Sequence, residues 1–128
     1  MTMTTVTKGT VGVGSAIYFF TNKGYVVSIP ITDNQPYDIV VDRGDGLEKV
    51  SVKYTSQKSK YGIYICELKS VRPNRNKNVV KKFDERSCDI VFIATSSGEY
   101  YLIPSKNIPA KTALALGDKV AKYKVSVF

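Results

Sequence analysis

Apolar and polar residues alternate in the middle of the chain in the pattern of a β-hairpin. Residues 37–42 and 47–53 carry apolar side chains at every second position, and the residues between them, Arg43-Gly44-Asp45-Gly46, are typical of a turn. This alternation gives the hairpin one apolar and one polar face. The apolar face carries Ile39, Val41, Val50 and Val52. We expect this face to lie against the core and to set which side the polar residues occupy.

The polar face of the hairpin brings together a carboxylate, a hydroxyl and an ammonium group. If the turn residues form the loop, Asp38 lies opposite Ser51, and Lys53 is diagonal to Asp38 on the same face. A register shifted by two residues puts Asp38 opposite Lys53 and keeps the group together. Only an odd shift separates the three, because it turns every side chain to the other face.

Two interpretations of this polar group stay open on the hairpin alone. The simpler one is a cross-strand ion pair between Asp38 and Lys53, which contributes roughly 0.2–1 kcal/mol. The other is a site of metal-assisted hydrolysis, in which the Asp holds a divalent cation and the Lys orients or deprotonates the attacking water. Ion pairs of this kind are common in hairpins, so the rest of the chain has to decide.

The remaining pattern predicts helices and further strands around this hairpin. Apolar residues recur at helical spacing over residues 9–23, and Gly24 ends that helix. The later elements are a strand at 25–30, a strand at 61–68, a basic loop at 69–78, a short helix at 79–86 with Val80 and Phe83 inward, a hairpin with strands 89–95 and 99–103, and a strand-like segment at 113–116. This order predicts an α/β (α+β) fold with a central mixed β-sheet flanked by helices.

Composition narrows the class of protein and the chemistry it can use. A chain of 128 residues with 43% apolar content suits one compact domain. We find no apolar run long enough to span a membrane and no N-terminal leader pattern, so we expect a cytoplasmic protein with no membrane partner. Cys66 and Cys88 lie far apart beside apolar residues, which favours buried thiols over zinc ligation or a disulfide. Histidine is absent, which excludes Ser-His and Cys-His nucleophiles and HExxH zinc sites.

The formal charge of +8 is concentrated in one segment. Between residues 58 and 82 the only acid is Glu67, and the basic residues are Lys58, Lys60, Lys69, Arg72, Arg75, Lys77, Lys81 and Lys82. Such a one-sided segment indicates a surface that faces a polyanion, with nucleic acid as the expected partner. Tyrosines at 54, 61 and 64 are interleaved with it, and either strand packing or contact with sugar and phosphate explains them.

Taken together, several segments resemble the PD-(D/E)xK nuclease superfamily. They are the N-terminal helix, Gly24-Tyr25, Pro30, Pro36-Tyr37-Asp38, Val50-Ser51-Val52-Lys53 and residues 89–104. The branch they look most like comprises small phage and cyanobacterial group I intron homing endonucleases and Holliday-junction-resolvase-like proteins. The resemblance implies a restriction-endonuclease-like core at about 9–104 within a single nuclease-like domain of residues 1–128, with a basic C-terminal extension at 105–128. It also implies an intracellular protein, with a phage gene in a bacterial host as one source.

The resemblance assigns roles to the residues of the hairpin. In that family the Asp at the position of Asp38 binds Mg²⁺, the residue two before the Lys binds or orients the ion, and the Lys activates water. Asp38 and Lys53 match this pattern. Ser51 stands where Glu, Asp or Gln is usual, and Val13 stands where the first helix often carries Glu. The resemblance therefore implies Asp38, Ser51 and Lys53 as catalytic residues, Asp38 and the Val52 carbonyl as metal ligands, and Mg²⁺ or Mn²⁺ as cofactor.

The two departures leave two main hypotheses. The leading one is a Mg²⁺-dependent DNA endonuclease; the alternative is a catalytically degenerate protein of the same fold that binds DNA or a partner without cleaving. A basic protein that binds only a protein partner is a third hypothesis without direct support. Asp42, Asp45 and Glu48 are poor replacement ligands, because they lie too far away, in the turn, or on the other face. We expect a homodimer or homotetramer that contacts DNA through Lys58, Lys60, Arg72, Arg75, Lys77, Lys81 and Lys82.

Overall fold

A six-stranded mixed sheet forms the centre of the protein. The computed structural model describes residues 3–32, 34–74 and 77–127, with the side chains of 71–78 left aside. The strand order is β1-β2-β3-β7-β8-β10. The strands are β1 (Val26–Ser28), β2 (Ile39–Asp42), β3 (Leu47–Thr55), β7 (Ile90–Thr95), β8 (Tyr100–Pro104) and β10 (Lys124–Val125). Only β3 and β7 pair in parallel, and the other neighbours are antiparallel. The predicted central mixed sheet is confirmed.

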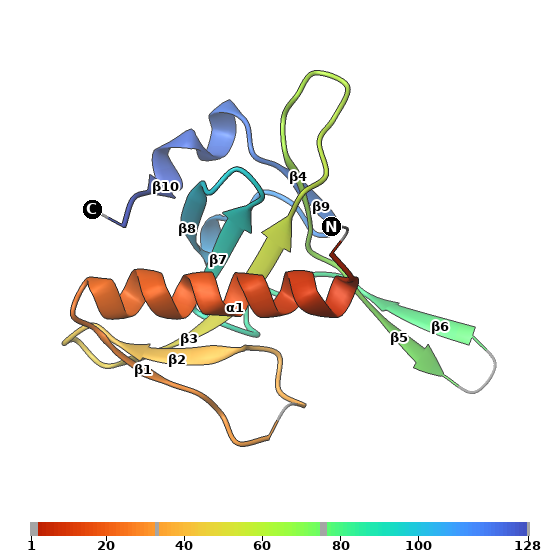
Figure 1. The fold of residues 1–128 in the computed structure, drawn as a ribbon. Helices are drawn as coiled ribbons and strands as arrows, with labels where there is room; N and C mark the ends of the chain where they lie inside the picture. Colours follow the sequence, from red (N-terminus) through yellow and green to blue (C-terminus); the bar gives the residue numbers. More distant parts are fainter. Residues whose placement is uncertain (1–2, 33, 75–76, 128) are drawn as a thin grey trace.

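One helix, α1 (Thr5–Asn22), lies across one face of this sheet (Figure 1). It begins before the predicted residue 9 because the Thr4 side chain caps it, accepting a hydrogen bond from the Thr7 N–H at 3.1 Å. Gly24, with a φ of 84°, follows its end as predicted. Gly12 allows the helix to sit close to β3, since a Cβ there would lie 3.2 Å from Tyr54 Cβ.

The sheet is buried on both faces at its centre. Against α1 the buried side chains are Ala16, Phe19, Phe20, Ile39, Val41, Val50, Ile90, Phe92 and Ala94. On the other face they are Tyr64, Cys66, Leu68, Phe83, Cys88, Val91, Ile93, Tyr101, Ile103, Leu114, Leu116 and Val120. Every residue of β7 is buried, as expected of a central strand with layers on both sides.

Short elements rather than a second α-helix cover the face opposite α1. They are the paired strands β4 (Ile65–Glu67) and β9 (Ala113–Ala115), with the 3₁₀ turns η1 (Ser105–Asn107) and η2 (Asp118–Tyr123). The strand predicted at 61–68 is therefore present but shorter. The strand-like segment at 113–116 is confirmed as β9, and the chain beyond residue 104 contributes three of the buried side chains listed above.

A two-stranded hairpin, β5 (Ser70–Asn74) and β6 (Lys77–Lys81), projects from the body of the protein (Figure 1). The predictions of a loop at 69–78 and a helix at 79–86 are wrong here, because Val79 and Val80 pair with Arg72 and Val71 across this hairpin. Val80 is 55% exposed, whereas Phe83 is buried as predicted. β-Branched residues favour strands, and an isolated helix of eight residues is marginal in water.

Two further sequence predictions concern the cysteines and the membrane. Cys66 and Cys88 are both buried and unpaired with each other, which confirms the prediction of buried thiols. Burial raises the pKa of the Cys66 thiol to about 12. Within the part of the chain that the structure describes, no helix is both long and apolar enough to cross a membrane.

Candidate functional site

The β2–β3 hairpin has the register that places the polar residues together. Asp42 pairs with Leu47 and Ile39 with Val50, so the intervening turn residues form the loop as predicted. Continuing this register puts Asp38 opposite Ser51. The loop is closed by a hydrogen bond from the Gly44 N–H to Asp42 Oδ1 at 2.8 Å.

Asp38 continues the pairing with β3 just before β2 begins. Its own N–H donates to the Val50 carbonyl at 2.9 Å, and its Oδ2 accepts from the Val52 N–H at 2.6 Å. The N–H and carbonyl of one strand residue point to the same edge, so the Val52 carbonyl also faces the Asp38 segment. The carboxylate of Asp38 is therefore held at the exposed edge of β3, beside a backbone carbonyl.

The simple cross-strand ion pair is not what the structure shows. Among the ion pairs of the described residues, which include both Asp38 and Lys53, these two are not joined. Asp38 is exposed, Ser51 is only 7% exposed, and Lys53 is half-buried. The three side chains thus share one face of the sheet and differ in their access to solvent.

These residues line one cleft of about 240 Å³ between the sheet and the layer that covers it. From the sheet side come Gln35, Pro36, Asp38, Ser51, Val52 and Lys53; from the covering side come Leu68, Ser70, Lys81, Lys82, Phe83, Asp84 and Ser87. The structure therefore brings together the sequence-predicted Asp38, Ser51, Val52 and Lys53, and adds two lysines from the end of the projecting hairpin.

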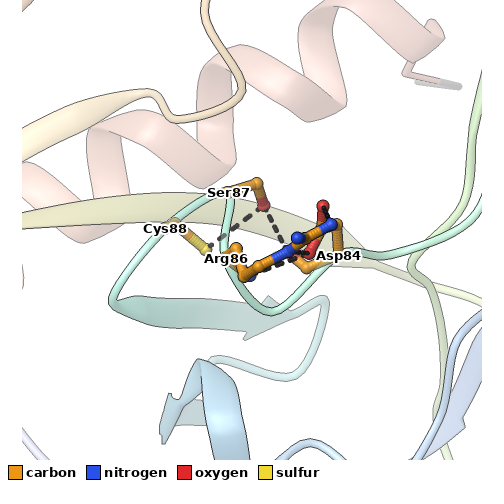
Figure 2. Close-up of polar contacts among 4 residues, drawn as sticks. All are labelled: Asp84, Arg86, Ser87 and Cys88. Atoms are coloured by element: carbon orange, nitrogen blue, oxygen red, sulfur yellow. Dashed lines mark hydrogen bonds and ion pairs between the residues drawn. The ribbon is translucent and has the colours of Figure 1, made fainter.

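The charge of the cleft favours anions. Three lysine ammonium groups line it against the carboxylates of Asp38 and Asp84. Asp84 is already bound by Arg86, whose Nε lies 3.2 Å from Asp84 Oδ1 (Figure 2). The hydrogen bond from Arg86 holds the pKa of the Asp84 carboxyl below its ordinary value of 3.8. The Ser87 hydroxyl donates to the Asp84 carbonyl at 2.6 Å in the same turn. Asp38 is thus the carboxylate of the cleft without a guanidinium partner.

The predicted DNA-binding residues fall into three groups. Lys81 and Lys82 line the cleft. Lys58 and Lys60 lie in the segment between β3 and β4, where their ammonium groups stack over the rings of Tyr64 and Tyr61 at 4.9 and 5.1 Å. Arg75 lies outside the described residues, and so do the side chains of Arg72 and Lys77. The backbones of Arg72 and Lys77 belong to the projecting hairpin.

The positions that depart from the family pattern lie in ordinary structural surroundings. Val13 is half-buried and packs against the core between α1 and the sheet. Asp42 is engaged by the turn, and Glu48 binds Arg43 at 2.6 Å, so neither is turned to the cleft. Asp45 is exposed in the turn. None of these carboxylates replaces a missing ligand.

The oxygen donors of the cleft suit a hard divalent cation. They are the Asp38 carboxylate, the Ser51 hydroxyl, the Gln35 amide and the Val52 carbonyl. Among the described residues, His, Cys, Asp and Glu side chains form no group of three or more that could hold a metal ion. A cation at this cleft would therefore have one carboxylate without an ion-pair partner, Asp38, and several neutral oxygens as ligands. Oxygen ligands suit Mg²⁺, but a single negative charge would hold it weakly.

Comparison with known proteins identifies the family. The sequence model of the PD-(D/E)XK endonuclease family matches residues 3–127. The chain belongs to this family. No curated protein sequence matches it.

The fold of this PD-(D/E)XK protein is also found in a solved structure. The structure of a bacterial homing endonuclease, I-Ssp6803I, matches this protein with a TM-score of 0.84 and 23% sequence identity. The match covers 95% of this chain and 89% of the homing endonuclease chain. At this identity the likeness establishes the fold, a mixed sheet with a helix on one face. The sequence resemblance to the PD-(D/E)xK superfamily is confirmed.

Sequence reasoning missed four polar residues of the cleft, Gln35, Ser70, Asp84 and Ser87, of which Gln35 and Asp84 matter most for its chemistry. Gln35 lies in the turn-rich segment 32–36 just before Asp38, so its nearness in sequence was a usable signal. Asp84 is brought in only by the layer that covers the sheet. No local pattern pointed to it.

Proposed function

We propose that this protein is a DNA endonuclease that hydrolyses backbone phosphodiesters with Mg²⁺ or Mn²⁺. The proposal rests on one observation, the meeting of Asp38, Ser51 and Lys53 with Lys81 and Lys82 in one cleft of a chain from an endonuclease family. Carboxylate and lysine on one sheet face supply the ligand and the water-activating group, and the added lysines attract a phosphate.

Each residue of the cleft has a distinct task in this proposal. Asp38, the Ser51 hydroxyl and the Val52 carbonyl hold the divalent ion, which supplies positive charge at the reacting phosphate when it is bound. Lys53 orients the attacking water and takes part in its deprotonation. Half-burial of Lys53 limits the water around its ammonium group, which strengthens its interaction with charged neighbours.

In this proposal the DNA backbone is held by lysines of the cleft and of the segment between β3 and β4. Lys81 and Lys82 contact phosphates next to the scissile one, and Lys58 and Lys60 contact phosphates along the segment between β3 and β4. Arg72, Arg75 and Lys77 belong to the same proposal on the strength of their charge in the sequence. Most hydrogen bonds of a protein to DNA go to phosphate and sugar, which matches a surface built from lysines.

The alternative is a protein of the same fold that binds DNA without cutting it. The observation that favours it is the single unpaired carboxylate in the cleft, with Ser51 and Val13 at positions where family members usually carry ligands. Such a cleft would still attract phosphate through its lysines. The two functions separate only by a cleavage measurement.

The deciding experiment is cleavage of plasmid and four-way-junction DNA with Mg²⁺, with Mn²⁺ and with EDTA. We expect cleavage in both metals and none in EDTA, and we expect Asp38→Ala and Lys53→Ala each to abolish it in proteins that remain folded. Asp45→Ala and Lys119→Ala remove the same charges from exposed positions outside the cleft and should cleave like the parent. A parent that binds DNA but never cleaves establishes the alternative; equal cleavage by Asp38→Ala and the parent refutes the site.

The proposed enzyme acts as an oligomer of one-domain subunits. Residues 105–127 complete the sheet through β10 and its covering layer through β9, so the proposed nuclease domain extends over residues 3–127. The resemblance to homing endonucleases supports a cytoplasmic, intracellular enzyme. One chain offers one candidate site and duplex cleavage needs two, so a homodimer is the minimum and a homotetramer is compatible. The surface proposed for a second copy is the edge of the sheet at β1 and the residues after it, where Val26, Ile29 and Ile31 are 64–103% exposed.

A further inference from the structure

The cleft contains an amide that the nuclease mechanism proposed above does not use. Gln35 lines the cleft together with Asp38 and Ser51, and its side chain is half-buried. It reaches the cleft from the segment that leads into β2, three residues before Asp38. Ser51 occupies the position where a longer amide or carboxylate side chain is expected, and its own short side chain is almost fully buried. A longer polar side chain therefore stands beside a short one in the same cleft.

The orientation of the Gln35 amide is set by Thr32. Gln35 Nε2 donates to the Thr32 carbonyl at 2.6 Å, and Gln35 Oε1 accepts from the Thr32 hydroxyl at 2.9 Å. A carbonyl oxygen of a side-chain amide has two lone pairs, so Oε1 retains one acceptor site after this bond. Gln35 Nε2 is engaged by its hydrogen bond to the Thr32 carbonyl. The amide can thus present its oxygen while its donor side stays anchored.

The other polar groups of the cleft are less suited to the same role. Asp84 carries charge, but the Arg86 guanidinium and the Arg86 N–H, at 2.9 Å, already engage it. The Ser87 hydroxyl is turned to the Asp84 carbonyl (Figure 2). Lys81 and Lys82 are donors only. Gln35 is therefore the longer neutral acceptor on the Asp38 side of the cleft.

We infer that Gln35 is a metal-ligating residue whose amide oxygen completes the divalent-cation site with Asp38, in place of the longer side chain that Ser51 lacks. The inference rests on the proposed function, because it assumes that Asp38 holds a cation. Neutral amide oxygens are ordinary ligands of hard cations, directly or through a bound water. The purely structural role of Gln35 is its pair of hydrogen bonds to Thr32, and a charge change at Gln35 separates the two roles.

The test is Mn²⁺ binding by calorimetry in the full chain, with Mn²⁺ itself as the probe. Gln35→Ala should weaken Mn²⁺ roughly tenfold, and Gln35→Glu should tighten it by a similar factor, because ligand charge raises affinity for a hard cation. Gln57→Glu is the matched control, since this exposed glutamine lies outside the cleft and adds the same charge. It should leave Mn²⁺ affinity within about twofold of the parent. Thermal unfolding verifies that every variant is folded.

The possible results separate this inference from the proposed function. If Asp38→Ala abolishes Mn²⁺ binding while both Gln35 variants bind like the parent, the role of Gln35 is wrong and the site stands. If Gln57→Glu tightens Mn²⁺ as much as Gln35→Glu does, general charge explains the effect and the inference also fails. If the parent binds no Mn²⁺, alone or with duplex DNA, or if Asp38→Ala binds like the parent, both the inference and the metal-dependent nuclease are overturned.

Discussion

Two glycines of α1 provide a matched test of how closely this helix sits on the strand that carries the candidate site. A Cβ added at Gly12 would lie 3.2 Å from Tyr54 Cβ and 3.3 Å from Val52 Cγ1. A Cβ added at Gly14 would meet nothing within 4 Å. Both glycines lie in the interior of the helix, so replacement by Ala brings the same gain in helix propensity, about 1 kcal/mol. Only Gly12 adds a steric cost.

The size of that cost follows from how firmly β3 is held. Contacts of 3.2–3.3 Å require the neighbours to move by a few tenths of an ångström. β3 is bonded to β2 on one side and to β7 on the other, so it resists that movement. Overpacking of this kind costs typically about 1–3 kcal/mol. After the propensity gain, Gly12→Ala should be less stable than the parent by roughly 0–2 kcal/mol, and Gly14→Ala more stable by about 0.5–1 kcal/mol.

Urea denaturation followed by circular dichroism measures both variants. If the free energy of unfolding falls with urea at the same rate in both variants, the difference between their midpoints gives the difference in free energy of unfolding. We expect this difference between Gly12→Ala and Gly14→Ala to be roughly 1–3 kcal/mol. Because the crowded contact lies beside Lys53, Gly12→Ala should also cleave DNA more slowly than Gly14→Ala when both are fully folded. If Gly12→Ala is stabilised as much as Gly14→Ala, the close packing of α1 on β3 is wrong.

Three further predictions concern the DNA-binding surface, the oligomer and the turn beside the cleft. Replacing Arg72, Arg75 and Lys77 together by Ala should flatten the slope of log affinity against log salt by roughly two to three units on duplex DNA, because each lost phosphate contact removes about 0.9 from that slope. An unchanged slope means that these three residues do not contact phosphate. Ile31→Asp should convert the oligomer to monomers in light scattering, because it puts charge into an apolar contact, and a parent that is already monomeric contradicts the oligomer. Arg86→Ala should raise the pKa of Asp84 toward its ordinary value of 3.8 in an NMR titration. Because the pKa of Asp84 is lowered in the folded protein, the stability that the Asp84–Arg86 pair contributes is present above the ordinary pKa and is lost as pH falls through the folded pKa. Arg86→Ala should therefore lose this part of the pH dependence of unfolding. If the substitution leaves the pKa of Asp84 unmoved, Arg86 is not the cause of the shift.

The local pattern of the sequence determined the β2–β3 hairpin and the face that its polar residues share, while two even registers stayed open and the structure has the one with Asp38 opposite Ser51. The apolar residues at every second position could be buried only if Asp38, Ser51 and Lys53 faced the other way. This information lies within about fifteen adjacent residues. The same holds for α1, whose apolar residues recur with the helical period, and for β7 and β8.

The local pattern was insufficient for the projecting hairpin. The run around Val79 and Val80 is too short for its periodicity to separate a helix from a strand. Its conformation is decided by pairing with residues 70–74. The polar, basic sequence of that segment has no alternation of apolar and polar residues that would predict a strand. The prediction of a helix at 79–86 failed for this reason.

Only the tertiary structure assembled the cleft. The parallel pairing of β3 with β7 joins residues about forty positions apart, as in Val50 with Ile90, and the chain between them returns over the sheet face as its covering layer. That return brings Lys81, Lys82 and Asp84 to the site. Such contacts depend on the burial of both faces of the sheet, a property of the whole fold, so no short stretch of sequence encodes them. The sequence alone thus determined which chemical groups the hairpin offers, and the fold decided that Lys81, Lys82 and Asp84 surround them.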